Sequence, residues 1–135
     1  MTLKLRPKNW KTMVKHVSST APEEACGLVA GLGKQAELVI PVTNQLASTE
    51  RFFMDPVELL RGLEKIEQSG LELLAVYHSH PRGPDYPSSV DLVEYSLPET
   101  ITIIWYPDDA GWKCKGFCID NSQYYPIEMS WGSQE

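Results

Sequence analysis

The chain is poor in cysteine and histidine, with three of each among 135 residues. Three cysteines are too few, and odd in number, for a disulfide framework, and they favour a reducing compartment. No stretch stays apolar over the roughly 20 residues that a membrane span needs. No apolar signal-peptide core follows the charged segment Met1 to Arg6. We therefore expect a cytoplasmic protein that does not enter the membrane.

Positive charge is also scarce. Lysine and arginine together number 12 against 18 acidic residues, which gives a net charge of −6, and the basic residues form no cluster. This balance argues against nucleic acid as a partner. The length allows one domain with one core. We expect that domain to occupy residues 1–131 and a flexible tail to occupy residues 132–135.

Two of the three histidines lie together, directly after a predicted buried strand. The apolar run Leu71 to Tyr77 leads into His78 and His80, whose i, i+2 spacing places both imidazoles on one face of the strand. Pro81 then ends the pairing, and a loop rich in glycine and proline follows. The two histidines could therefore share one metal ion.

Asp91 allows two interpretations. In the first, Ser88 is the N-cap of a short helix over Leu92 to Ser96, and Asp91 is its N3 residue in a capping-box arrangement. In the second, the loop folds back and Asp91 supplies a third ligand to the ion. Two nitrogens and one oxygen leave a fourth tetrahedral position for water, as in catalytic zinc sites. The residue types alone leave both interpretations open.

The spacing of these residues resembles a known family. His78-Ser79-His80, seven residues, Ser88, two residues and Asp91 is similar to the signature of the JAMM (MPN-plus) zinc metallopeptidases. That family also has an upstream catalytic glutamate in a Glu-x-Cys-Gly-Leu segment, and Glu24 is the matching residue here. Further similar positions are Asn44, Phe53, Asp55 and Pro56.

The resemblance implies both a fold and a set of roles. The implied fold is the cytidine deaminase-like JAMM/MPN fold, an α/β single domain with one mixed β-sheet and packed helices. His78, His80 and Asp91 would hold one Zn²⁺ per chain. Glu24 would act as general base and acid, and Ser88 would donate a hydrogen bond to the oxyanion. Ser79, on the opposite face of the strand, would be structural.

The implied reaction is hydrolysis of a peptide or isopeptide bond. Because a chain of this length has little room for the insertions of polyubiquitin-cleaving members, we expect a small ubiquitin-like β-grasp sulfur-carrier protein as substrate, cut at its C-terminal Gly-Gly tail. The alternatives are a non-catalytic MPN scaffold that binds partners and a zinc amidase for small peptides. The scaffold members lack the ligand set that this chain retains.

The remaining pattern predicts helices that alternate with strands. One helix is expected at Pro7–Ser19, with His16 on its solvated side, and another from the N-cap Asp55 to Gly70, with an apolar stripe of Val57, Leu60, Leu63 and Ile66 against the sheet. Arg51 to Met54 is expected to form a short strand that pairs with the substrate tail. Other strands are predicted at Ala25–Leu32, Glu37–Val42, Leu71–His80, Thr100–Tyr106, Trp112–Ile119 and Tyr124–Met129.

Overall fold

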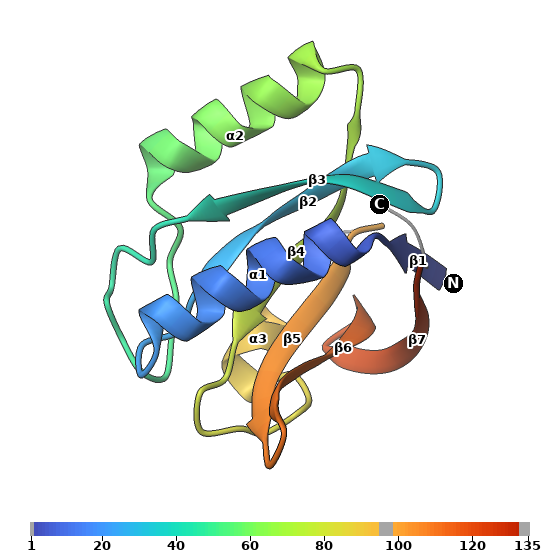
Figure 1. Cartoon of the computed structure of the whole chain (residues 1–135). Helices are drawn as coiled ribbons and strands as arrows, with labels where there is room; N and C mark the ends of the chain where they lie inside the picture. The colour runs from blue at the N-terminus through green and yellow to red at the C-terminus, as the bar shows by residue number, and fades with distance from the viewer. Residues whose placement is uncertain (1, 95–98, 133–135) are drawn as a thin grey trace.

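The computed structural model describes residues 2–94 and 99–132 of the chain (Figure 1). The described residues form a mixed α/β domain, as the sequence predicts. The elements in chain order are β1 Thr2–Leu5, α1 Pro7–Thr20, β2 Cys26–Leu32, β3 Gln35–Val42, α2 Pro56–Gln68, β4 Glu72–Ser79, α3 Ser89–Glu94, β5 Ile101–Asp108, β6 Gly111–Asp120 and β7 Gln123–Trp131.

The strands form one mixed sheet in the order β1-β3-β2-β4-β5-β6-β7, which closes into a barrel through β1 and β7. The pairs β4–β5, β1–β3 and β1–β7 are parallel, and the other neighbours are antiparallel. β3 and β4 both pair with β2, so α2 crosses over β2 to connect them. The side chains of β2 and β4 therefore alternate between two buried faces.

Two hydrophobic clusters fill these faces. The first packs Met13 and Val17 of α1 against Val29, Tyr77 and other residues of the barrel interior. The second packs Ile66 of α2 against residues of β2 and of the segment before α2. Its buried members are Cys26, Leu28, Ala30, Val42, Phe52, Met54 and Ile66. His78 follows Tyr77 in β4, so its side chain lies on the opposite face of the strand. There it stacks on Phe52 of the second cluster.

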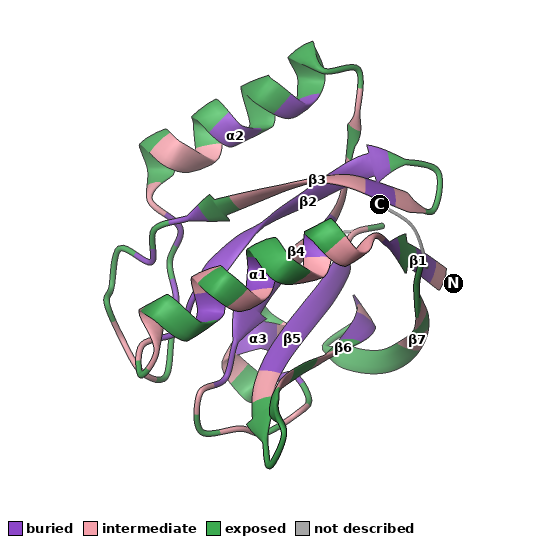
Figure 2. Ribbon diagram, viewed as in Figure 1, coloured by how far each residue is buried: buried purple, intermediate pink, exposed green. Residues whose placement is uncertain are grey.

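The ends of α2 agree with the prediction, but its apolar stripe does not. Asp55 Oδ1 accepts hydrogen bonds of 3.0 Å from the backbone N–H groups of Val57 and Glu58, and Gly70 has a φ of +71° beyond the C-terminus. Ile66 is buried as expected. The helix presents Gly62 to the sheet, where a Cβ would meet the side chain of Leu28, and exposes the rest of the predicted stripe (Figure 2). The exposed residues are Val57, Leu60 and Leu63.

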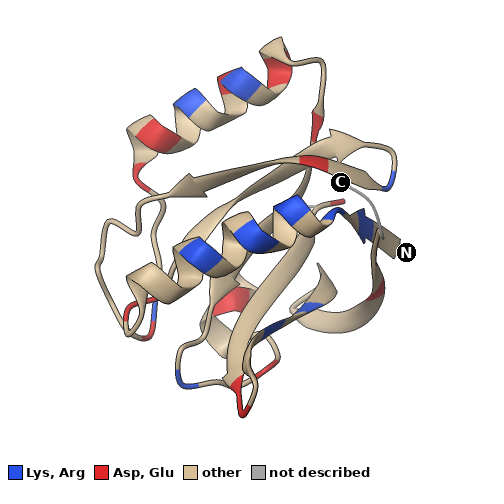
Figure 3. Cartoon of the chain, in the orientation of Figure 1, with Lys and Arg blue, Asp and Glu red and all other residues tan. Residues whose placement is uncertain are grey.

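Two other predictions were wrong. Arg51 to Met54 forms no strand; only Met54 makes an isolated bridge, with Asn44. His16 is half-buried, and its Nδ1 lies 2.7 Å from the hydroxyl oxygen of Tyr77. The outer side of α1 is instead lined by lysines (Figure 3). The third histidine is therefore part of the packing between α1 and β4.

The chain ends and the short helix differ from expectation in detail. β1 was not predicted, although Leu3 and Leu5 are buried on either side of the exposed Lys4. α3 begins earlier than predicted, and residues 95 and 96 of the predicted helix lie outside the described residues. Of the predicted tail, the N–H of Gly132 donates to the carbonyl of Leu5, and residues 133–135 lie outside the described part. No helix in residues 2–94 or 99–132 is both long and apolar enough to cross a membrane.

Candidate metal and active site

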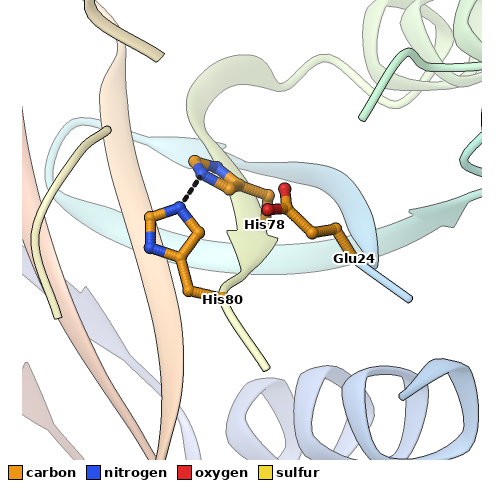
Figure 4. A group of neighbouring side chains, drawn as sticks. All are labelled: Glu24, His78 and His80. Carbon is orange, nitrogen blue, oxygen red and sulfur yellow. Dashed lines mark hydrogen bonds between the residues drawn. The ribbon is translucent and has the colours of Figure 1, made fainter. Parts of the chain in front are cut away.

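The two histidines project from the C-terminal end of β4 into one buried site (Figure 4). His78 is paired in the sheet with both β2 and β5, and the N–H of His80 donates to the carbonyl of Trp105 at 2.8 Å. Both side chains are almost fully buried. Their Nε2 atoms lie 3.1 Å apart, so the i, i+2 spacing does bring the two imidazoles together.

Asp91 reaches the same point from α3. Its Oδ2 lies 3.1 Å from Nε2 of His78 and 3.1 Å from Nε2 of His80. The same oxygen accepts a hydrogen bond from the backbone N–H of Ser88, while the hydroxyl oxygen of Ser88 accepts from the N–H of Asp91. The capping box therefore exists and aims the carboxylate at the histidines. The two interpretations of Asp91 are compatible.

The hydrogen bonds of His80 define its tautomer. Its Nδ1 lies 2.8 Å from the carbonyl oxygen of Pro84, which can only accept, so Nδ1 carries a proton and Nε2 is the nitrogen that faces Asp91 and His78. Burial lowers the pKa of His78 and favours its neutral form. Burial opposes ionisation of Asp91, but its contacts with both histidines outweigh this effect and hold the carboxyl pKa far below its usual range. Two nitrogens and a carboxylate oxygen thus converge where a cation could bind.

Glu24 lies beside this group, just before β2. Glu24, His78 and His80 each offer a ligand atom within 4.8 Å of the other two, and the Glu24 side chain points toward the histidines in Figure 4. Its Oε1 has no hydrogen-bond partner among the described residues. Burial raises the pKa of Glu24 to about 8. Because Asp91 Oδ2 lies 3.1 Å from both Nε2 atoms, we take Asp91 as the candidate third ligand and Glu24 as a residue that could contact a bound water.

Phe52 belongs to the site, although the sequence pattern predicted a different role for it. Phe52 is buried and stacks on the imidazole of His78, with ring centroids 4.6 Å apart and an interplanar angle of 27°. It was predicted as part of an edge strand that pairs with substrate. The backbone N–H of the adjacent Phe53 donates to Asn44 Oδ1, and the carbonyl of Phe53 accepts from Gln45, so this segment is already hydrogen-bonded to its neighbours.

A family model matches residues 7–115, which contain every residue of this site. The matched family is described as prokaryotic homologs of the JAB domain, and the chain belongs to this family. In structure, it is similar to a Desulfitobacterium hafniense protein solved in solution, with a TM-score of 0.88, 31% identity and coverage of 100% of this chain and 94% of that one. A JAB1/MPN domain protein from Archaeoglobus fulgidus has the same fold, with a TM-score of 0.63, 20% identity and coverage of 97% and 98%.

Three curated relatives have described activities. A probable TtuB-protein conjugate cleaving protease of Thermus thermophilus is 45% identical over 58% of this chain and 53% of its own length. A desampylase of Pyrococcus furiosus is 36% identical over 64% and 61%. A CysO-cysteine peptidase of Mycobacterium tuberculosis is 33% identical over 64% and 61%. The matched segment thus spans between half and two thirds of these relatives.

Proposed function

We propose that this protein is a zinc-dependent hydrolase of peptide or isopeptide bonds that acts at the C-terminal Gly-Gly tail of a small ubiquitin-like β-grasp sulfur-carrier protein. The observation that carries the proposal is the convergence of His78 Nε2, His80 Nε2 and Asp91 Oδ2, each 3.1 Å from the other two, beside the buried Glu24. The activities of the three curated relatives support the substrate class.

The donor set fits zinc. Ligand atoms of a tetrahedral zinc with bonds of about 2.0 Å lie roughly 3.3 Å apart, close to the 3.1 Å separations found here. Histidine nitrogen and carboxylate oxygen are both common zinc ligands. The Pro84 carbonyl orients His80, as a hydrogen-bond acceptor behind a metal-bound histidine commonly does.

Each residue then has a task that its position allows. His78, His80 and Asp91 would hold the ion, and bound zinc would supply Lewis acidity that brings the pKa of a water toward neutrality. Glu24 would accept a proton from that water and return it to the departing amine. Ser88 would donate a hydrogen bond to the oxyanion, because the bond from the Asp91 N–H uses only its oxygen and leaves its hydrogen.

The first test is mass spectrometry of sulfur-carrier conjugates, both linear and isopeptide-linked, incubated with the zinc-loaded protein. We expect release of the carrier with a free Gly-Gly end. The Glu24→Gln variant keeps the size and polarity of the side chain but not its basicity, so its zinc content should be unchanged and its turnover lower by roughly 10²-fold or more.

The test also separates the alternatives. A scaffold would bind a conjugate without cleaving it, and an amidase would cleave short peptides in preference to the carrier. Loss of zinc in Glu24→Gln would make Glu24 a ligand, and activity within about tenfold of the wild type would exclude it as the base. The cytoplasmic location and the domain over residues 1–131 are part of the same proposal.

A further inference from the structure

Residues 44–54, within the segment that joins β3 to α2, lie against the backbone of Glu24. We call this stretch the 44–54 loop. Glu24 and Ala25 precede β2, which begins at Cys26, so their peptide groups lie beyond the end of that strand. They nevertheless make four hydrogen bonds of 3.0 Å or less. The sources of these bonds indicate what fixes the position of Glu24.

Two of the four bonds come from the 44–54 loop. The N–H of Glu24 donates to the carbonyl of Ser48 at 2.8 Å, and Asn44 Nδ2 donates to the carbonyl of Glu24 at 3.0 Å. The other two come from Ser79, between the histidines. Its hydroxyl oxygen accepts from the N–H of Ala25 at 2.8 Å, and its own N–H donates to the carbonyl of Ala25 at 3.0 Å. Ser79 has no exposed surface.

Asn44 uses both ends of its side-chain amide. Nδ2 donates to the carbonyls of Glu24 and Arg51, and Oδ1 accepts from the N–H groups of Leu46 and Phe53. Both hydrogens of the amide are thus donated, and its oxygen accepts twice. The side chain is buried, so each of these bonds would be costly to lose. Asn44 therefore ties the backbone of Glu24 to both ends of the 44–54 loop.

We propose that Asn44 and Ser79 are positioning residues that aim the carboxylate of Glu24 at the site between His78 and His80. The inference rests on the proposed function, in which Glu24 transfers the proton. The Oε1 atom of Glu24 has no hydrogen-bond partner among the described residues, and the hydrogen bonds at Glu24 and Ala25 fix the backbone from which this side chain extends. Because Ser79 stands between the two histidines, it links the base and the metal ligands through one strand.

Two variants with matched partners test this role. Ser79→Ala removes the acceptor for Ala25, and Ser79→Thr keeps a hydroxyl. Asn44→Asp keeps the acceptor oxygen but loses both donated bonds, and Asn9→Ala is a control because Asn9 is also buried and bonds locally to Arg6 in α1. We expect Ser79→Ala and Asn44→Asp to lower kcat by about tenfold or more, since small misplacements of a catalytic group are costly. Metal content and KM should stay unchanged, and Ser79→Thr should recover kcat.

Coupling to Glu24→Gln separates positioning from general damage. If Asn44 and Ser79 act through Glu24, their substitutions should cause little further loss of kcat once Glu24 is glutamine. The inference is overturned if either substitution lowers kcat by the same factor in both backgrounds. It is also overturned if Asn9→Ala, at equal loss of stability, lowers kcat as much as Asn44→Asp does.

Amide hydrogen exchange gives a readout that does not need activity. In metal-loaded Ser79→Ala, the N–H of Ala25 should exchange at least about tenfold faster relative to the core amide of Val29. An unchanged exchange rate of the Ala25 N–H relative to that of Val29 would overturn the proposed positioning role of Ser79. If the wild type cleaves no conjugate, the proposed function has failed, and the exchange result alone still decides whether Ser79 holds this segment. If Asn44→Asp does not fold, the comparison of Ser79→Ala with Ser79→Thr still tests the positioning role.

Discussion

The two loops beside the site are held in different ways. The 44–54 loop is fixed by buried polar groups, chiefly Asn44, and by Phe52 packed on His78. The loop of residues 81–88, between the proposed ligands, bonds to His80 at its base through Pro84. Its tip, in contrast, is held by exposed contacts. These are an ion pair of Asp85 with Lys115 and a stack of Tyr86 on Tyr124, with centroids 6.1 Å apart.

This difference indicates that the two loops have different roles. Buried hydrogen bonds and stacked rings hold atoms in one place, whereas exposed ion pairs contribute little stability and yield easily. We infer that the 44–54 side fixes the geometry of the chemical groups and that the tip around Tyr86 meets the substrate. The following predictions test the two sides separately.

The largest effect is expected at the centre that both loops border. His78→Ala removes one of three proposed ligands, so the purified protein should lose its equivalent of zinc and all activity. His16→Ala is the control, because His16 is a half-buried histidine that lies on α1 and contacts Tyr77. Metal analysis of both variants decides the question. Full zinc in His78→Ala would show that the site lies elsewhere.

Adjacent phenylalanines allow a direct comparison within the 44–54 loop. Phe52 is 2% exposed and Phe53 is 46% exposed. Phe52→Ala should lower the free energy of unfolding by about 3–5 kcal/mol, as for other buried aromatic residues, and Phe53→Ala by less than about 0.5 kcal/mol. Urea denaturation of the two variants measures both values. Similar losses would contradict the claim that this loop is fixed through its buried side.

Asp91 has two functions in the structure, and one substitution separates them. Asn can still accept the capping bond, so Asp91→Asn should cost less than about 1 kcal/mol of stability. Its zinc affinity should fall by at least about 10- to 100-fold, because the charged ligand is lost. Asp55→Asn is the control, since the carboxylate of Asp55 also accepts backbone N–H bonds at a helix start, as the N-cap of α2. Unchanged zinc affinity in Asp91→Asn, measured by chelator competition, would reduce Asp91 to a helix cap.

The sequence predicted the elements that depend on local rules. The Asp55 cap and the buried strands follow from short-range patterns, and the structure shows them. Local spacing also predicted two features of the site. The i, i+2 spacing brings His78 and His80 together, and the spacing of Ser88 and Asp91 gives the capping box. The stripe predicted for α2 repeats every three residues and therefore drifts around a helix of 3.6 residues per turn. The side that faces the sheet carries Leu59, Gly62 and Ile66.

The missed contacts join residues far apart in the chain. His16 and Tyr77 are 61 positions apart, and Ala25 and Ser79 are 54 apart. Their pairing depends on how α1 and β2 pack on β4, which no local pattern encodes. One signal for Phe52 was present in the sequence, because it is an aromatic residue beside the family-like position Phe53. Its stacking on His78, however, depends on how the 44–54 loop folds against β4. Long-range packing therefore supplies the contacts around the site that local sequence patterns do not encode.

The smallest effect is expected at the tip of the 81–88 loop. Tyr86 is 46% exposed, so Tyr86→Ala should leave stability and metal content nearly unchanged. If the tip meets the substrate, KM for a carrier conjugate should rise by roughly fivefold, equivalent to about 1 kcal/mol, with kcat unchanged. Tyr125→Ala is the control, because Tyr125 is similarly exposed but makes its hydrogen bond to Gln123 on β7. Lys115→Met removes the ion pair with Asp85 and should cost less than about 1 kcal/mol of stability. A fall in kcat for Tyr86→Ala at constant KM would contradict this inference, because it would show that the tip of the 81–88 loop affects the chemical step and not substrate binding.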